Sequence, residues 1–323
     1  MIRGLVIGKF MPVHKGHIAL INFAAAKCDE LIVSMSYANN DPINFELRFE
    51  WLKTIFAEQP HIKVHTIKDD FNDEALLLSF RTELWAKRMK EYYPSIDIIF
   101  SSENYGAPFA ISLGAKHIVF DVDRRTVPVS ATLIRTKPLT YWDYIPKTVQ
   151  PFFLKKICFY GPESTGKTTM AKMMAERCQT TWVPEAAREL LVSNEFSVDD
   201  IIRIGITHDN YIAEKSATAN RVLFYDTDVL TTQIYAKHYF GFVPSILFEL
   251  EQKTSYDIYF LMDIDIPWIE DHLRDHGERR EEMMHLFKAE LEKRNIPLIL
   301  ISGDHKERKM KVRNEIDRFF QQF

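Results

Sequence analysis

The stretch GPESTGKTT at residues 161–169 restricts the possible folds of this chain more than any other feature. It has the spacing G-x-x-x-x-G-K-[ST] and lies between an apolar run at 155–160 and a helical pattern at 166–178. In such strand–loop–helix units, backbone N–H groups and the helix N-terminus surround a phosphate. The stretch therefore predicts a parallel α/β domain that holds a nucleotide at this loop.

The side chains of this loop have separate expected roles. Lys167 should reach the β- and γ-phosphates of ATP, and Thr168 should ligate Mg²⁺. The expected ATP contacts are Gly161, Glu163, Ser164, Thr165, Gly166, Lys167, Thr168 and Thr169.

Charged residues after two later apolar runs point to phosphoryl transfer. Asp226, in FYDTD, can hold Mg²⁺ or accept the proton of an attacking hydroxyl group. We expect Glu185, Arg188 and Asp228 to contact the substrate. Each acid taken singly could instead be a solvated strand end, but strand ends on the loop side of one sheet lie close together.

An arginine-bearing segment at 267–280 is a candidate lid for this second half. Arg274 could close over the transferring phosphoryl group and neutralise its charge. An exposed, charged helix face is the alternative interpretation. The chain after the loop is too short for a motor or translation-factor apparatus, so a small-molecule kinase fits best.

The length of 323 residues favours two domains. Pro146 and Pro151 interrupt any helix between the halves, so we expect domains at 1–150 and 151–323. Strands alternating with helices predict a parallel sheet in each. The expected strands are 4–8, 30–36, 62–68, 96–102, 116–123, 155–160, 180–185, 220–228, 255–263 and 296–304.

A second phosphate-binding pattern, GKFMPVHKGH, occupies residues 8–17. Its strand ends at Gly8, and His14 and His17 stand at the start of the next helix, where anions are favoured and imidazoles can donate hydrogen bonds. Gly16 would let a phosphate approach the backbone. A zinc half-site is the alternative, but no further ligand lies nearby in sequence.

The segment VSATLIR at 129–135 is the expected partner of that pattern. Ser130 and Thr132 carry hydroxyl groups at a helix start, and Arg135 follows one turn later. Together they can hold a polyphosphate through charge-assisted hydrogen bonds.

These motifs carry a family resemblance. HxGH followed by S-x-T-x-x-R resembles the nucleotidylyltransferase superfamily. With SSENYG, YWDYIP, GPESTGKTT, YDTDVLTTQ and PWIEDHLR, the pattern resembles the NadR-type family over nearly the whole chain. That resemblance implies a Rossmann-like nicotinamide mononucleotide (NMN) adenylyltransferase domain followed by a P-loop ribosylnicotinamide kinase domain. ATP and Mg²⁺ would be the cofactors, and NAD the product.

The resemblance also implies residue roles. Lys9, His14 and His17 would hold the ATP phosphates, with His17 and Arg135 as charge stabilisers. Trp85 could reach the nicotinamide ring, although core packing is slightly favoured. Further expected nucleotide and substrate contacts are Gly8, Phe10, Gly16, Ser101, Ser102, Glu103, Asn104, Ser130 and Thr132.

Two departures from the family pattern are visible. Longer members carry an N-terminal helix-turn-helix that represses transcription, whereas Met1 here leads directly into the first expected strand, so we expect neither that module nor repressor activity. Many relatives have glycine where this chain has His272, which leaves the contacts of the lid open.

The sequence says less about cellular location, partners, oligomeric state and the alternative functions. Scattered cysteines and the lack of a signal peptide predict a cytoplasmic protein, and a net charge of -4 disfavours nucleic acid as a partner. The oligomeric state stays open. A flavin or pantetheine phosphate as substrate, or a nucleotide-sensing regulator with little turnover, are the alternative functions.

Overall fold

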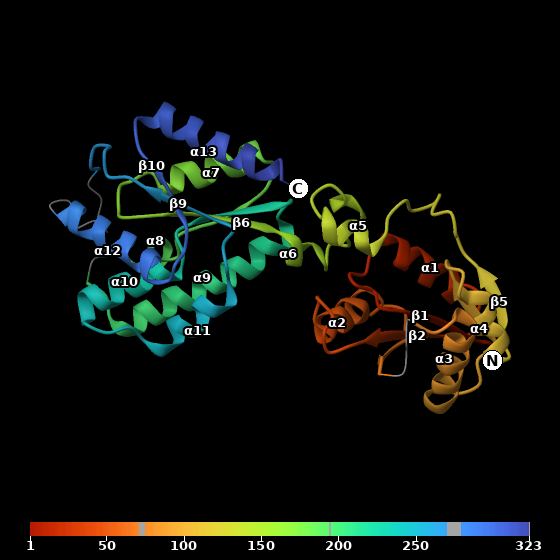
Figure 1. Cartoon of the computed structure of the whole chain (residues 1–323). Coiled ribbons are helices and arrows are strands. Elements are labelled where there is room, and N and C mark those ends of the chain that lie inside the picture. The colour runs from red at the N-terminus through yellow and green to blue at the C-terminus, as the bar shows by residue number, and fades with distance from the viewer. Residues whose placement is uncertain (71–74, 194, 270–278, 323) are drawn as a thin grey trace. The chain divides into compact units, whose positions relative to one another are not determined.

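The computed structural model describes two compact units, Met1–Gln150 and Pro151–Phe323 (Figure 1). All residues are described except 71–74, 194, 270–278 and 323. Each unit contains a five-stranded sheet in which all strand pairs are parallel. The predicted α/β class with two parallel sheets is therefore confirmed.

The first sheet has the strand order β3-β2-β1-β4-β5. Its strands are β1 (Arg3–Gly8), β2 (Glu30–Tyr37), β3 (Ile62–Lys68), β4 (Ile98–Ser101) and β5 (Lys116–Val119). Its helices are α1 (Lys15–Ala25), α2 (Phe45–Ile55), α3 (Leu78–Tyr92), α4 (Gly106–Leu113), α5 (Ala131–Thr136) and the short η1 (Trp142–Tyr144). The strand order reverses at β1, and such reversals open a crevice beyond the carboxyl ends of the strands.

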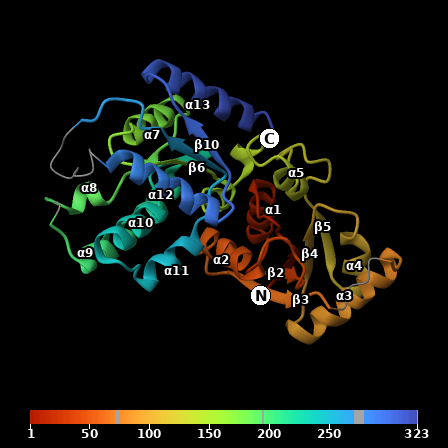
Figure 2. The same cartoon turned by 60° about the vertical axis from the view of Figure 1, so that its left-hand side comes forward.

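Helices cover both faces of this sheet (Figure 2). On one face, Leu5 of β1 and Ile99 of β4 pack in a core cluster with Met89 of α3 and Phe109 of α4. Helices α1 and α2 lie against the other face. Burial on both faces explains why the central strand is continuously apolar rather than alternating.

The second sheet has the strand order β10-β9-β6-β8-β7. Its strands are β6 (Lys155–Tyr160), β7 (Trp182–Val183), β8 (Val222–Asp226), β9 (Ile258–Met262) and β10 (Leu298–Ile301). The helices are α6 (Gln150–Phe153), α7 (Lys167–Arg177), α8 (Ala187–Leu190), α9 (Val198–Thr218), α10 (Val229–Phe240), α11 (Ser245–Lys253), α12 (Arg280–Lys293) and α13 (His305–Phe320).

Two helix layers enclose this second sheet. On one side, Met170 and Met174 of α7 and Val312 and Ile316 of α13 share a core cluster with the central strands. Helices α9, α10 and α11 pack together on the opposite side (Figure 1). No helix among the described residues has the length and apolar character needed to cross a membrane.

Candidate active sites

The loops at the carboxyl ends of the first sheet surround a cavity of about 900 Å³. The loops that follow β1 and β4, together with α3 and the start of α5, form its walls. Predicted site residues that line it are Gly8, Lys9, Phe10, His14, Gly16, His17, Trp85, Ser102, Glu103, Asn104, Ser130, Thr132 and Arg135. Folding thus brings together two patterns that lie far apart in the sequence.

His14 is the N-cap of α1, and this contact sets its tautomer. Its Nδ1 accepts the backbone N–H groups of Gly16 at 3.1 Å and His17 at 3.3 Å. Burial, with a smaller contribution from Arg124, lowers the pKa of His14 to about 4. The ring is therefore neutral with its proton on Nε2, which is available to donate to a ligand oxygen.

His17 stacks on His14, with ring centroids 3.7 Å apart. Burial lowers the pKa of His17 well below its usual value, and His14 and Arg124 add to the shift. Two neutral imidazoles at a helix start provide directed hydrogen bonds but no charge. Charge neutralisation in this cavity must come from its arginines and Lys9.

Packing favours glycine at position 16, in addition to the predicted approach of a phosphate to the backbone there. A Cβ atom at this position would lie 3.0 Å from the imidazole atoms Nδ1 and Cε1 of His14. The absence of a side chain lets the His14 ring fold back onto the first turn of α1. The HxGH spacing therefore serves the capping contact itself.

Arg135 connects the two patterns. Its guanidinium donates hydrogen bonds to the carbonyl oxygen of Met11 and to Thr132 Oγ1. Ser130 Oγ accepts the backbone N–H of Leu133 at 3.2 Å and so caps α5. Arg135 is held at the cavity wall by protein contacts that leave its charge beside the predicted polyphosphate position.

A second cavity, of about 180 Å³, lies beside the loop at 161–169. Predicted residues that line it are Glu163, Ser164, Thr165, Gly166, Lys167, Thr168, Thr169, Glu185, Arg188 and Asp228. Gly161 has φ of 135°, and a Cβ atom there would lie 2.9 Å from the carbonyl oxygen of Met262, so the loop requires glycine at this position.

Lys167 and Thr168 already make defined contacts. Lys167 Nζ donates to the carbonyl oxygens of Gly161 at 2.8 Å and Pro162 at 2.7 Å. Thr168 Oγ1 donates to Asp226 Oδ2 at 2.6 Å. The lysine charge thus rests on its own loop, from which it can move to a phosphate.

Asp226 has the chemistry of a magnesium ligand or base. Its Oδ1 is buried without a hydrogen-bond partner. Burial, followed by the nearby charge of Glu185, raises the pKa of Asp226 to about 6. The adjacent hydroxyl and carboxylate oxygens of Thr168 and Asp226 are the hard ligands that Mg²⁺ prefers. The described residues contain no group of three or more His, Cys, Asp or Glu placed to bind a metal.

Comparison with known proteins places the chain in a family. The trifunctional NAD biosynthesis/regulator protein NadR of Escherichia coli is 31% identical over 327 residues, covering 93% of this chain and 79% of the relative. The chain belongs to the NadR family. Family models described as cytidylyltransferase-like and as an AAA domain match residues 5–137 and 156–308.

Further similar proteins match either one part of this chain or nearly all of it. A nicotinamide-nucleotide adenylyltransferase of Pyrococcus abyssi is 28% identical over 159 residues, which is 46% of this chain and 81% of that enzyme. Crystal structures of NadR proteins, one with NR and one with NAD and AMP-PNP, both superpose with a TM-score of 0.83. They are 22% and 23% identical and cover 98% and 99% of this chain and 96% of their own, which supports the same two-unit fold.

Two predicted contacts of this NadR-family chain have packing roles in the structure. Ser101 is fully buried behind the first cavity, and its Oγ lies 2.9 Å from His117 Nε2, so it supports the strand end instead of lining the site. Trp85 does line the cavity, but it also packs edge-on against Tyr105 and Phe109. Core packing is thus observed, and contact of Trp85 with a nicotinamide ring stays a prediction.

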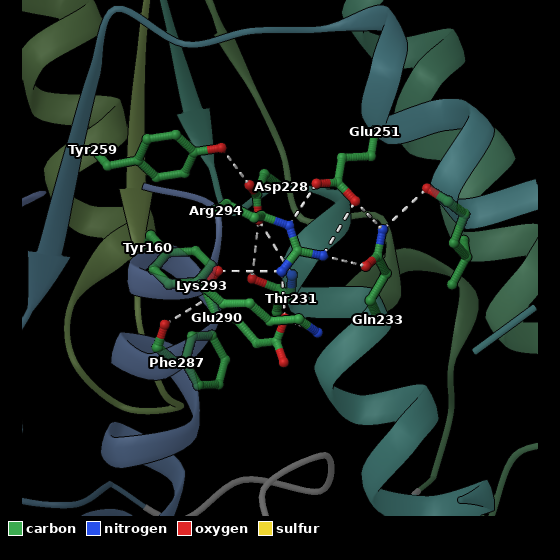
Figure 3. A network of polar contacts seen from close by, with 11 residues as sticks. Tyr160, Asp228, Thr231, Gln233, Glu251, Tyr259, Phe287, Glu290, Lys293 and Arg294 are labelled. Carbon is green, nitrogen blue, oxygen red and sulfur yellow. Dashed lines mark hydrogen bonds and ion pairs between the residues drawn. The ribbon is translucent and has the colours of Figure 1, made fainter. Parts of the chain in front are cut away.

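Asp228, a predicted substrate contact that lines the second cavity, also has a structural role (Figure 3). It is the N-cap of α10, with Oδ1 accepting the N–H of Thr231 at 3.2 Å and Oδ2 accepting the hydroxyl of Tyr259 at 2.8 Å. Only 1% of Asp228 is exposed. Both oxygens have protein partners, so Asp228 fixes the start of α10 against Tyr259 of β9.

Three arginines of structural importance were absent from the sequence interpretation. Arg124 lines the first cavity. Arg48 is fully buried beneath the loop of Lys9, and Arg308 is buried beneath the loop at 161–169. For Arg48 a signal existed, because it shares the buried face of α2 with Trp51 and Leu52. Arg274 and His272 of the predicted lid lie outside the described residues.

Proposed function

We propose that the chain is a bifunctional NAD-forming enzyme whose two activities are divided between its two units. The C-terminal unit phosphorylates nicotinamide riboside with ATP to give NMN. The N-terminal unit adenylates NMN with a second ATP to give NAD and pyrophosphate. The observation that carries this proposal is a separate cavity beside each sheet of a NadR-family chain, lined in each case by residues of a predicted phosphate-binding pattern.

The adenylylation step needs no base. A phosphate oxygen of NMN, already anionic, attacks the α-phosphorus of ATP, and the bond to the bridging oxygen of the β-phosphate breaks to release pyrophosphate. His14 and His17 donate hydrogen bonds to the phosphates as neutral rings. Arg135 and Lys9 neutralise the charge that develops on the leaving group.

The kinase step does require a proton acceptor. The ribose 5′-hydroxyl attacks the γ-phosphorus of ATP, ADP leaves, and the hydroxyl proton passes to a carboxylate. Asp226 is ionised at neutral pH because its pKa of about 6 lies below 7. Lys167 leaves the loop carbonyls for the β- and γ-phosphates. When bound, Mg²⁺ supplies charge neutralisation, and Thr168 and Asp226 are the residues that would hold it.

A time course tests the proposal. The protein is incubated with nicotinamide riboside, ATP and Mg²⁺, and NMN and NAD are quantified; we expect NMN first and NAD later. NMN is then offered in competition with flavin and pantetheine phosphates. Preferred adenylylation of either competitor, or tight nucleotide binding without pyrophosphate release, would contradict the proposal. A cytoplasmic location belongs to the same proposal, since both steps consume ATP.

A further inference from the structure

His208 is a buried polar residue of the second cavity that the proposed mechanism does not use. It lies on α9 and is only 4% exposed. With Ile201 and Ile204 it forms the part of the cavity wall that α9 contributes. The other two residues on this face are apolar, so a histidine here requires a separate explanation.

The hydrogen bonding of His208 defines its protonation. The ring is hydrogen bonded to the backbone of Pro184, which has only a carbonyl oxygen to offer, so the ring must donate. Its Nε2 is buried and has no partner, so the donating atom is Nδ1. Burial lowers the pKa of His208 to about 4, which keeps the ring neutral. Nε2 therefore carries an unused lone pair.

A buried acceptor without a donor is unfavourable and rare in folded proteins. Such an atom beside a cavity indicates a ligand that brings a donor. Asp228 is a further buried polar residue that lines both this cavity and the neighbouring one. Its oxygens accept hydrogen bonds from Thr231 and Tyr259, and a carboxylate has no hydrogen to donate to Nε2.

Aromatic residues in the same cavity suit a flat cationic ring. Phe196 and Tyr239 meet edge to face with centroids 4.9 Å apart, and Tyr235 stacks on Tyr239 at 6.2 Å. All three line the cavity together with His208. A pyridinium ring is attracted to such aromatic surfaces, and the polar substituent on the ring then needs a hydrogen-bonding partner.

We propose that His208 is a specificity-determining residue of the kinase site, whose Nε2 accepts a hydrogen bond from the carboxamide N–H of nicotinamide riboside. This inference rests on the proposed kinase function. Nicotinic acid riboside carries a carboxylate in place of the carboxamide and has no N–H to donate. It would place two acceptors face to face in a buried site, so the enzyme should reject it.

The experiment compares kcat/KM for the two ribosides in wild-type protein, His208→Leu and His208→Gln. We expect wild type to prefer nicotinamide riboside. In His208→Leu that preference should fall about tenfold or more, chiefly through loss of activity on nicotinamide riboside. In His208→Gln, whose amide both donates and accepts, activity on nicotinic acid riboside should rise.

Ile204→Val is the matched control, since it alters the same wall without touching a polar atom and should change both ribosides by one factor. NMN adenylylation reports folding of the other unit, and the KM for ATP reports the nucleotide loop. An unchanged riboside ratio in both His208 variants would overturn the inference. In that case the unpaired Nε2 would face the neighbouring cavity of about 310 Å³, which His208 also lines. If the wild-type protein phosphorylates neither riboside, the proposed kinase function is wrong as well. An unchanged riboside ratio with an active kinase would disprove only the role of His208.

Discussion

Single buried charges hold the predicted phosphate-binding loops of this protein in place. Arg48 of α2 donates to the carbonyl oxygen of Lys9 at 2.5 Å and pairs with Asp41 at 2.6 Å. Asp41 Oδ1 in turn lies 3.9 Å from Lys9 Nζ. The backbone and the side chain of Lys9 are thus both tied to one buried ion pair.

Removing this arginine should affect the first unit only. We expect Arg48→Met to destabilise that unit by about 3–5 kcal/mol, because Asp41 is left nearly buried without its partner, and to lower NMN adenylylation. Kinase activity should persist. Denaturant unfolding and both assays measure this, with Lys53→Met as control, since Lys53 pairs with Glu50 on the exposed face of the same helix. Equal effects of the two substitutions would contradict the assigned role.

Asp226 makes the kinase sensitive to pH. Only the ionised carboxylate can bind metal or take a proton, so activity should be present above its pKa of about 6 and be lost as pH falls through it, to about one tenth at pH 5. NMN adenylylation should stay level over this range, because His14 is neutral down to about pH 4. Parallel pH profiles check this; a kinase that is flat between pH 5 and 7 would exclude the role.

Substitution of Asp226 separates its two possible tasks. Asp226→Asn should lower the kinase rate by about 10²–10⁴-fold. Partial recovery at high Mg²⁺ would support the metal role, and Glu185, which lines the second cavity and acts electrostatically on Asp226, would then be the better base. No recovery would favour Asp226 as the base.

At the scale of elements, α13 is hydrogen bonded to the loop at 161–169 through Arg308. Arg308, 1% exposed, donates to the carbonyl oxygens of Gly303 at 2.8 Å, Thr165 at 2.9 Å and Asp263 at 2.8 Å, and pairs with Asp265. One side chain therefore connects the C-terminal helix to the loop at 161–169 and to the end of β9.

The loss of this connection should appear in ATP binding. Arg308→Met leaves several buried acceptors unpaired, at about 1–3 kcal/mol each, and should raise the KM for ATP in the kinase assay alone. Arg313→Met is the control, since Arg313 lies on the same helix, more than half exposed, and pairs with Asp317; it should alter stability by less than about 0.5 kcal/mol. An unaltered KM in a folded Arg308→Met protein would show that the loop keeps its shape without α13.

A second group of contacts joins three helices around α10 (Figure 3). Arg294, at the end of α12, pairs with Glu251 of α11 at 2.6 Å and donates to Gln233 of α10 at 3.0 Å. Gln233 also donates to Glu251 at 2.8 Å. These bonds hold α10 to α11 and α12, and the N-cap Asp228 separately ties the start of α10 to Tyr259 of β9.

For the whole molecule, the two cavities predict activities that can be removed one at a time. Lys167→Ala should abolish riboside phosphorylation and leave NMN adenylylation close to wild type, because Lys167 lines the second cavity and its hydrogen bonds are to Gly161 and Pro162 of its own loop. His17→Ala should do the reverse. Separate assays with nicotinamide riboside and with NMN measure both rates. If either change silenced both activities in a folded protein, the assignment of one activity to each unit would be wrong.

Short-range patterns were enough to predict the two parallel sheets, the approximate strand positions and the two loops that line the cavities. Strand and helix periodicity, the glycine of a strand–helix turn and the histidine at a helix start act over a few residues, so they can be read along the chain. Long-range packing settled the rest: the tautomer of His14, the capping role of Asp228, the burial of Ser101 and the arginines beneath each loop. Whether a charge such as Arg308 is exposed or buried depends on which distant carbonyl oxygens folding brings within hydrogen-bond distance, and local sequence does not contain that information.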